Sequence, residues 1–129
     1  NLKVVSIPGP SAVISALSVS GFSACEFTFV GFLPRKGKRR NEVLEDLARQ
    51  TRVVVIYESP YRLSKTLSDL VSVLGGNRKA VVARELTKLH EEVIKGTLDE
   101  VLQSFSQRTV KGEITIVVEG NDKEKGHQT

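Results

Sequence analysis

Short apolar runs and helical apolar stripes alternate along this chain. Apolar and β-branched runs predict strands at residues 3–7, 26–31, 52–57, 79–84, 91–95 and 113–119. Apolar residues at helical spacing predict helices at residues 12–20, 41–50, 59–74 and 97–105. Two strands follow each other between residues 79 and 95, so the sheet is expected to be mixed. The pattern predicts an α/β domain, with a mixed β-sheet of about five or six strands flanked by helices.

Polar residues predict where three of these helices begin. Asn41 is expected to cap the helix at 41–50. Ser59 followed by Pro60 is typical of a helix start, with the serine as cap and the proline in the first turn. Thr97 and Glu100 have the spacing of a capping box, in which each side chain bonds the other's backbone N–H.

The length of the chain suits one domain with its own core. The 129 residues are 40% apolar and 26% charged, an ordinary globular balance. The run at residues 53–56 is β-branched throughout, which is typical of a central parallel strand. There is no methionine and the chain opens directly into a predicted strand, so we expect a piece of a longer protein. Residues 121–129 are charged and poor in apolar residues, which predicts a disordered tail.

Composition excludes several classes of protein. No apolar run reaches the roughly 18 residues of a transmembrane helix, so we expect no membrane partner. The single cysteine, Cys25, excludes an internal disulfide and a cysteine zinc cluster, and a reducing cytoplasm fits best. His90 and His127 have no neighbouring ligands in the sequence, so no metal site is expected.

The basic charge is concentrated in one segment. The net charge is +4, and the basic run of residues 35–40 accounts for the whole excess. The run comprises Arg35, Lys36, Lys38, Arg39 and Arg40. It contains glycine and is bracketed by Pro34 and Asn41, which predicts a surface loop. Such a loop could serve only solubility, but its charge density without an acidic partner favours an anionic ligand such as nucleic acid.

The Pro-Gly-Pro-Ser segment at residues 8–11 lies between a predicted strand and a predicted helix. Ligands of open α/β sheets bind at such strand ends, where free backbone N–H groups attract a carboxylate or phosphate. A rigid strand-to-helix turn explains the same residues equally well. The segment matches neither the P-loop motif nor the dinucleotide-binding motif, so its sequence does not identify a ligand.

Two further polar loops follow strands at the same expected edge. Glu58 could accept a hydrogen bond from a ribose hydroxyl. Alternatively, its negative charge only interacts favourably with the dipole at the start of the next helix. Arg62, one turn further on, could meet a carboxylate or phosphate. The third loop, residues 84–88, either lines a ligand or holds a packed pair of Arg84 and Glu85. Together, three polar loops at one sheet edge favour a ligand site more than any one of them does.

Six short segments, taken in order, resemble one family. They are Ile-Pro-Gly-Pro-Ser-Ala at 7–12, Gly-Phe-Leu-Pro at 31–34, Tyr-Glu-Ser-Pro-Tyr-Arg-Leu at 57–63, Ala-Arg-Glu-Leu-Thr-Lys at 83–88, Gly-Thr-Leu at 96–98 and Lys-Gly-Glu at 111–113. This set resembles the C-terminal part of the bacterial small-subunit ribosomal RNA 2′-O-ribose methyltransferases. These enzymes belong to the tetrapyrrole (corrin/porphyrin) methylase superfamily.

The resemblance implies a two-domain α/β enzyme that binds S-adenosylmethionine in the cleft between its domains. Residues 1–120 would be the C-terminal domain, and the partners would be its own N-terminal domain, a second copy of the chain in a homodimer, and ribosomal RNA or the small ribosomal subunit. The cofactor-binding positions that it implies are Pro8, Gly9, Pro10, Ser11, Ala12, Tyr57, Glu58, Leu86 and Ile114. Glu58 and Leu86 depart from the tetrapyrrole enzymes' pattern, which favours the RNA enzyme.

Methyl transfer to a ribose hydroxyl benefits from a base or from a charge that stabilises the alkoxide. The candidates for this catalytic role are Glu58, Glu85 and Lys88, and the candidates for RNA binding are the basic run and Arg62. No aromatic residue lies inside the basic run, so stacking on unpaired bases is not expected there. Half of a tetrapyrrole methyltransferase and a non-catalytic RNA-binding module remain as alternatives.

Overall fold

The computed structural model describes residues 27–87, 90–106 and 110–121, except for the side chains of residues 85–91. The strand predicted at 3–7, the loop at 8–11 and the helix at 12–20 lie outside these residues. The strands are β1 (Phe27–Phe32), β2 (Val53–Glu58), β3 (Lys79–Thr87), β4 (His90–Thr97) and β5 (Glu113–Val118). The helices are α2 (Gly37–Arg49), α3 (Leu63–Leu74) and α4 (Leu98–Phe105), with a 3₁₀ turn, η2 (Pro60–Arg62), before α3.

The five described strands form one mixed sheet, as the sequence predicts. Their order is β1-β2-β5-β3-β4, so the last strand along the chain is the central one. β2 runs parallel to β1 and antiparallel to β5, while β3 is antiparallel to both β5 and β4. The β-branched run of β2 is therefore interior, as predicted, but only one of its two neighbours is parallel.

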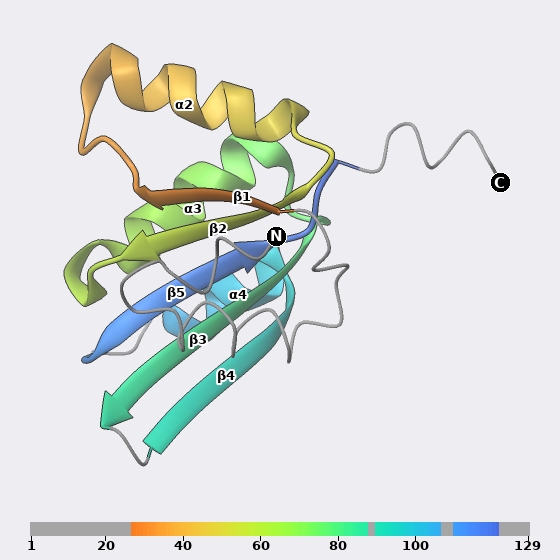
Figure 1. Ribbon diagram of the computed structural model, residues 1–129. Coiled ribbons are helices and arrows are strands. Elements are labelled where there is room, and N and C mark those ends of the chain that lie inside the picture. The colour runs from red at the N-terminus through yellow and green to blue at the C-terminus, as the bar shows by residue number, and fades with distance from the viewer. Residues whose placement is uncertain (1–26, 88–89, 107–109, 122–129) are drawn as a thin grey trace, which may run out of the picture.

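All three described helices cover the same face of the sheet (Figure 1). Alternate strand residues point to this face, and each helix turns its apolar stripe toward them. No described helix is long and apolar enough to cross a membrane. The main core between the layers includes Leu44, Leu47, Val54, Ile56, Leu63, Leu67, Leu70, Val82, Leu98, Val101, Phe105, Ile114, Ile116 and Val118. A smaller cluster on the opposite face of the sheet contains Val53, Val55, Val81 and Val117.

One predicted helix start is wrong, and a second is right in position but lacks the predicted side-chain cap. Helix α2 begins at Gly37 rather than at Asn41, so most of the basic run is helical and not a loop. Ser59 makes no side-chain cap; a 3₁₀ turn that starts at Pro60 precedes α3. The backbone N–H of Ser59 instead donates to the carboxylate of Glu58 at 2.8 Å. At the start of α2, the long-range contacts of Arg40 with α3 take the place of a local cap.

Asn121 extends the ordered chain by one residue beyond the predicted boundary. Its backbone N–H donates to the carbonyl of Gln50 at 2.7 Å, and its side-chain amide donates to the carbonyl of Ala48 at 3.0 Å. The other residues of the predicted tail, 122–129, lie outside the described residues, so the tail stays a prediction.

The capping box at the start of α4 is confirmed. Glu100 N donates to Thr97 Oγ1 at 3.2 Å, and Thr97 N donates to Glu100 Oε1 at 2.9 Å. A Cβ on Gly96 would lie 2.7 Å from Glu100 Oε1 and would push that carboxylate off the backbone. This contact explains why a glycine precedes the threonine in the Gly-Thr-Leu segment.

We predict that Thr97→Ala lowers the free energy of unfolding by about 1 kcal/mol, because the N–H of Glu100 loses its acceptor. Thr97→Ser keeps the hydroxyl and should retain most of that stability. Denaturant unfolding of the two variants measures the difference. Equal losses in both would assign the effect to packing of the threonine methyl group rather than to the cap.

Candidate functional site

The predicted site residues of β2, β3 and β5 meet at one edge of the sheet. β1, β2 and β3 run in the same direction, so their carboxyl ends lie together beside the start of β5. Across the three central strands, Glu58 pairs with Ile114, and Ile114 pairs with Arg84. The carboxyl ends of β2 and β3 therefore lie at one edge, as expected, but residues 84–87 continue β3 and do not form the predicted loop.

The pleat of the sheet divides these residues between its two faces. Glu58 and Ile114 continue the row of Ile56 and Ile116 that faces the helices, whereas Tyr57 belongs to the opposite face. Ile114 is only 2% exposed and lies in the main core. Its side chain is thus unavailable to a cofactor, and the predicted contact would have to come from its backbone.

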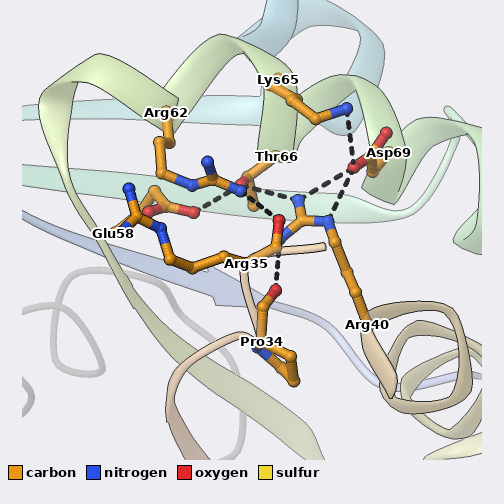
Figure 2. Close-up of polar contacts among 8 residues, drawn as sticks. All are labelled: Pro34, Arg35, Arg40, Glu58, Arg62, Lys65, Thr66 and Asp69. Carbon is orange, nitrogen blue, oxygen red and sulfur yellow. Dashed lines mark hydrogen bonds and ion pairs between the residues drawn. The ribbon is translucent and has the colours of Figure 1, made fainter. Parts of the chain in front are cut away.

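A buried arginine organises the helix side of this edge (Figure 2). Arg40, 4% exposed, forms an ion pair with Asp69, to which its Nε and Nη2 donate at 3.0 and 2.9 Å. Its Nη2 also donates to Thr66 Oγ1 at 3.1 Å, and its Nη1 donates to the carbonyl of Pro34 at 2.9 Å. One guanidinium thereby joins α2, α3 and the loop that follows β1.

The same network holds the carboxylate of Glu58. Glu58 is 6% exposed, and Thr66 Oγ1 donates to its Oε1 while the N–H of Ser59 donates to its Oε2. Both oxygens thus have partners within the chain. These contacts favour the alternative in which Glu58 organises the start of the following helix, and they leave its catalytic role without structural support.

The structure corrects the predicted role of Arg40 in RNA binding. Arg35, Lys36, Lys38 and Arg39 are exposed, but Arg40 is buried because its guanidinium pairs with Asp69. Arg62, the other predicted RNA-binding residue, bonds the start of the basic run. Its Nη2 donates to the carbonyl of Arg35 at 2.6 Å, which joins η2 to the loop after β1. Four exposed cations of the basic run therefore remain for an anionic partner.

The opposite face of the edge carries an aromatic group. The ring of Tyr57 lies edge-on to Phe29 at 5.2 Å and to Phe32 at 5.8 Å between centroids. Its hydroxyl is buried and has no hydrogen-bond partner among the described residues. Burial, reinforced by the negative charge of Glu113, raises the pKa of Tyr57 above its ordinary value of 10.0. A buried hydroxyl without a partner suits a polar ligand such as a nucleoside.

Arg84 forms an ion pair, but its partner is not the predicted one. Its Nη2 and Nε donate to Glu92 Oε1 at 2.5 and 2.9 Å, and its Nη1 donates to the carbonyl of Lys111 at 3.0 Å. In a β-strand neighbours point to opposite faces, so Glu92 on the adjacent strand is better placed than Glu85.

The remaining predicted site residues lie outside what the structure describes. For Glu85 and Leu86 the backbone is part of β3, but their side chains are not described. Lys88 and residues 8–12 are outside the described residues altogether. Their catalytic and cofactor-binding roles stay predictions.

Two features of the structure could not be expected from the sequence: two polar residues of the site, and a cavity away from it. Thr66 and Asp69 looked like ordinary polar residues of a helix, although their spacing of three places them on the same helix face. A cavity of about 360 Å³ also lies at the far end of the sheet, between the turn after α3 and the end of β5. It contains none of the predicted site residues.

The chain belongs to the family of tetrapyrrole (corrin/porphyrin) methylases, whose pattern it matches over residues 1–102. It is 51% identical to a ribosomal RNA small subunit methyltransferase I of Mycobacterium tuberculosis (strain CDC 1551 / Oshkosh), over 92% of this chain and 41% of the relative. It is 45% identical to a protein of the same name from Thermotoga maritima, over 94% of this chain and 54% of the relative. The chain spans about half the length of these curated relatives.

Solved structures share the fold at low sequence identity. A cobalt precorrin-4 methyltransferase of cobalamin biosynthesis, CbiF, superposes with a TM-score of 0.63 at 14% identity, over 83% of this chain and 48% of that protein. The methyltransferase CobJ superposes with a TM-score of 0.61 at 15% identity, over 84% and 47%. These similarities confirm the predicted fold class.

We predict that Arg40→Gln lowers the free energy of unfolding by about 3 kcal/mol, because it leaves Asp69 and Thr66 without their buried partner. The neighbouring Arg39→Gln is the matched control and should change stability by no more than about 0.5 kcal/mol, since Arg39 is exposed. Chemical denaturation compares the two. Similar effects of both substitutions would contradict a structural role confined to Arg40.

Tyr57 should make the fold sensitive to alkali. Its folded pKa is raised, so its contribution to stability is fully present below the unfolded value of about 10 and is lost as the pH rises through the folded pKa. The chain has two tyrosines, so Tyr61→Phe leaves Tyr57 as the only phenol. In that variant the phenolate absorbance should rise at a higher pH when the protein is folded than in denaturant. Coincident titrations would contradict the burial of the hydroxyl.

Proposed function

We propose that this chain is the C-terminal domain of an S-adenosylmethionine-dependent methyltransferase that modifies a ribose 2′-hydroxyl of small-subunit ribosomal RNA. The observation that carries the proposal is the high identity to two ribosomal RNA methyltransferases over more than nine-tenths of the chain. The proposed partners are an N-terminal domain, a second copy of the protein and the small ribosomal subunit. Such an enzyme would work in the cytoplasm.

The exposed cations support an RNA substrate. Arg35, Lys36, Lys38 and Arg39 lie before and within the first turn of α2, which has no acidic residue in that turn and no side-chain cap. Positive side chains oppose the helix dipole at an N-terminus, so this placement is unfavourable unless an anion binds nearby. RNA phosphates would supply that negative charge.

The carboxyl edge of the strands supports the cofactor half of the proposal. The unpaired hydroxyl of Tyr57 fits a group that donates or accepts a hydrogen bond, as the nucleoside part of S-adenosylmethionine does. Tyr57 and the backbone at Ile114 would hold the cofactor from this domain, together with residues 8–12 and Leu86. When bound, the cofactor supplies an electrophilic methyl group on a sulfonium.

The domain's residues would act mainly by positioning. The ribose oxygen must lie in line with the methyl carbon and its leaving sulfur, and such alignment supplies much of the rate. The 2′-hydroxyl proton needs an acceptor as the new O–C bond forms, and Glu85 is the proposed base of this half. Lys88 would stabilise the developing alkoxide, and Glu58 would support the edge through its bonds to Ser59 and Thr66.

A tetrapyrrole substrate is the second candidate, because the solved structures of similar fold include enzymes of cobalamin biosynthesis. Their identity to this chain, 14–15%, supports only the fold. A tetrapyrrole carries only a few carboxylates, whereas an RNA strand presents a phosphate at every nucleotide. Four exposed cations in one segment therefore suit RNA better.

The proposal predicts transfer of a labelled methyl group to small ribosomal subunits by the full-length protein, and the label should survive in 2′-O-methylated nucleosides after digestion of the RNA. Replacing Arg35, Lys36, Lys38 and Arg39 together by Gln should strongly reduce this transfer at physiological salt, because four phosphate contacts are lost. The affinity for S-adenosylhomocysteine, measured by calorimetry, should be unchanged in that variant.

This chain alone, without the other half of the proposed cleft, should show no transfer. Label on a base, label on a tetrapyrrole but not on RNA, or turnover by this chain alone would each contradict the proposal. The single Arg39→Gln variant serves as a graded control, since it removes only one of the four charges.

A further inference from the structure

Three large aromatic residues remain exposed on β1 and on the turn that follows β2: Phe29 within β1, Phe32 at its carboxyl end and Tyr61 in η2. Phe29 is 36% exposed, Phe32 67% and Tyr61 96%, and they are the exposed large hydrophobic residues of the described chain. Phe29 and Phe32 contact the ring of Tyr57, and Tyr61 lies in the turn after the same strand; we call these four residues the aromatic patch. Exposed apolar side chains that gather at one place mark an interaction surface more often than isolated ones do.

The patch is held in place from two sides. Phe32 ends β1 in register with Tyr57 of β2, and the Tyr57 ring supports both Phe29 and Phe32 through edge-on contacts. Tyr61 lies four residues after Tyr57 in η2, and the adjacent Arg62 bonds the carbonyl of Arg35 at 2.6 Å. The two loops that carry Phe32 and Tyr61 are thus joined to each other.

The patch adjoins the exposed cations of the basic run. Arg35 and Lys36 follow Phe32 by three and four residues, and the chain has no acidic residue between positions 27 and 41. Arg40 bonds the carbonyl of Pro34, so this loop is also fixed from the buried side. Protein interfaces are depleted of lysine, whereas aromatic side chains beside cations are the usual surface for single-stranded nucleic acid.

We propose that the aromatic patch stacks unpaired bases of the RNA strand whose phosphates bind the basic run, with Phe32 and Tyr61 as the stacking residues. This inference rests on the proposed function and adds how the strand is recognised. Sequence-specific recognition of RNA uses unpaired bases that stack on aromatic side chains. Stacking at the carboxyl edge of β1 and β2 would place the strand beside Tyr57, next to the proposed cofactor position.

The test uses the full-length protein and three RNA probes: a short single strand, the same strand with abasic sites, and its duplex. Phe32→Ala and Tyr61→Ala should each weaken binding of the single strand about ten-fold, because one stacked base is worth about that factor. On the abasic strand the variants should bind like the unchanged protein. Phe32→Tyr and Tyr61→Phe keep a ring and should restore single-strand affinity.

Lys38→Gln is the matched control for charge. It should weaken all three probes and flatten the dependence of affinity on salt, whereas the alanine variants should leave the salt dependence unchanged. Affinity for S-adenosylhomocysteine and the unfolding transition should be those of the unchanged protein in the alanine variants, which separates lost stacking from lost folding.

Unchanged single-strand affinity in the folded alanine variants would overturn the inference, as would equal weakening on the abasic strand. A shift in oligomeric state or in domain docking without loss of RNA affinity would show that protein covers the patch, and would also overturn it. If the unchanged protein methylates small subunits and only the stacking result fails, the proposed function stands. If the unchanged protein transfers no methyl group to small subunits, the proposed function fails by itself.

Discussion

The buried guanidinium of Arg40 is the constraint on which the site side of this domain depends. A charge removed from water is tolerated only when its partners are placed with good geometry. Here Asp69, Thr66 and the carbonyl of Pro34 accept bonds from all three nitrogens of the group. These bonds determine how α2 lies against α3, and where the chain passes between β1 and α2. The four exposed cations that precede Arg40 are placed by the same contacts, because they lie on the segment that Arg40 anchors.

The two faces of the sheet differ at this edge. On the helix side, Glu58 and Arg84 form hydrogen bonds with other residues of the chain. On the other side, the buried hydroxyl of Tyr57 has no partner in the part of the chain that the structure describes, and Phe32 remains largely exposed. Because successive residues of a strand point to opposite faces, Tyr57 and Glu58 belong to different surfaces although they are neighbours in sequence. The polar groups of the helix side are therefore paired within the chain, whereas the opposite side carries exposed aromatic rings.

Helix α2 shows a local preference overridden by tertiary contacts. Its first turn holds three cations and no acid, which opposes the helix dipole, and no side chain caps it. The helix nevertheless starts at Gly37, because Leu44 and Leu47 pack into the core and Arg40 bonds α3. Violations of local rules are expected where a segment also has to bind something. The unfavourable charges agree with an anionic ligand for this segment.

The sequence by itself determined the features whose causes lie within a few residues. The strands from β1 to β5, the apolar stripes of the three helices and the capping box of Thr97 and Glu100 follow from periodicities and spacings that neighbouring residues carry. The carboxyl edge followed as well, since strands alternating with helices bring their ends together. The family was visible for a similar reason, because its motifs are short continuous segments of the sequence.

Only the tertiary structure decided which of the five adjacent cations would be buried. Arg39 and Arg40 are equivalent as neighbours in sequence, but the partners of Arg40 lie 26 and 29 residues away on α3. It also decided that aromatic residues adjoin the basic run, since Tyr57 and Tyr61 come from the next strand and turn. An interaction partner that is distant in sequence cannot be inferred from local spacing, because the packing of the helices and the sheet determines its position. For that reason the start of α2, the pairing of Arg84 with Glu92 and the aromatic patch could not be predicted from the residues alone.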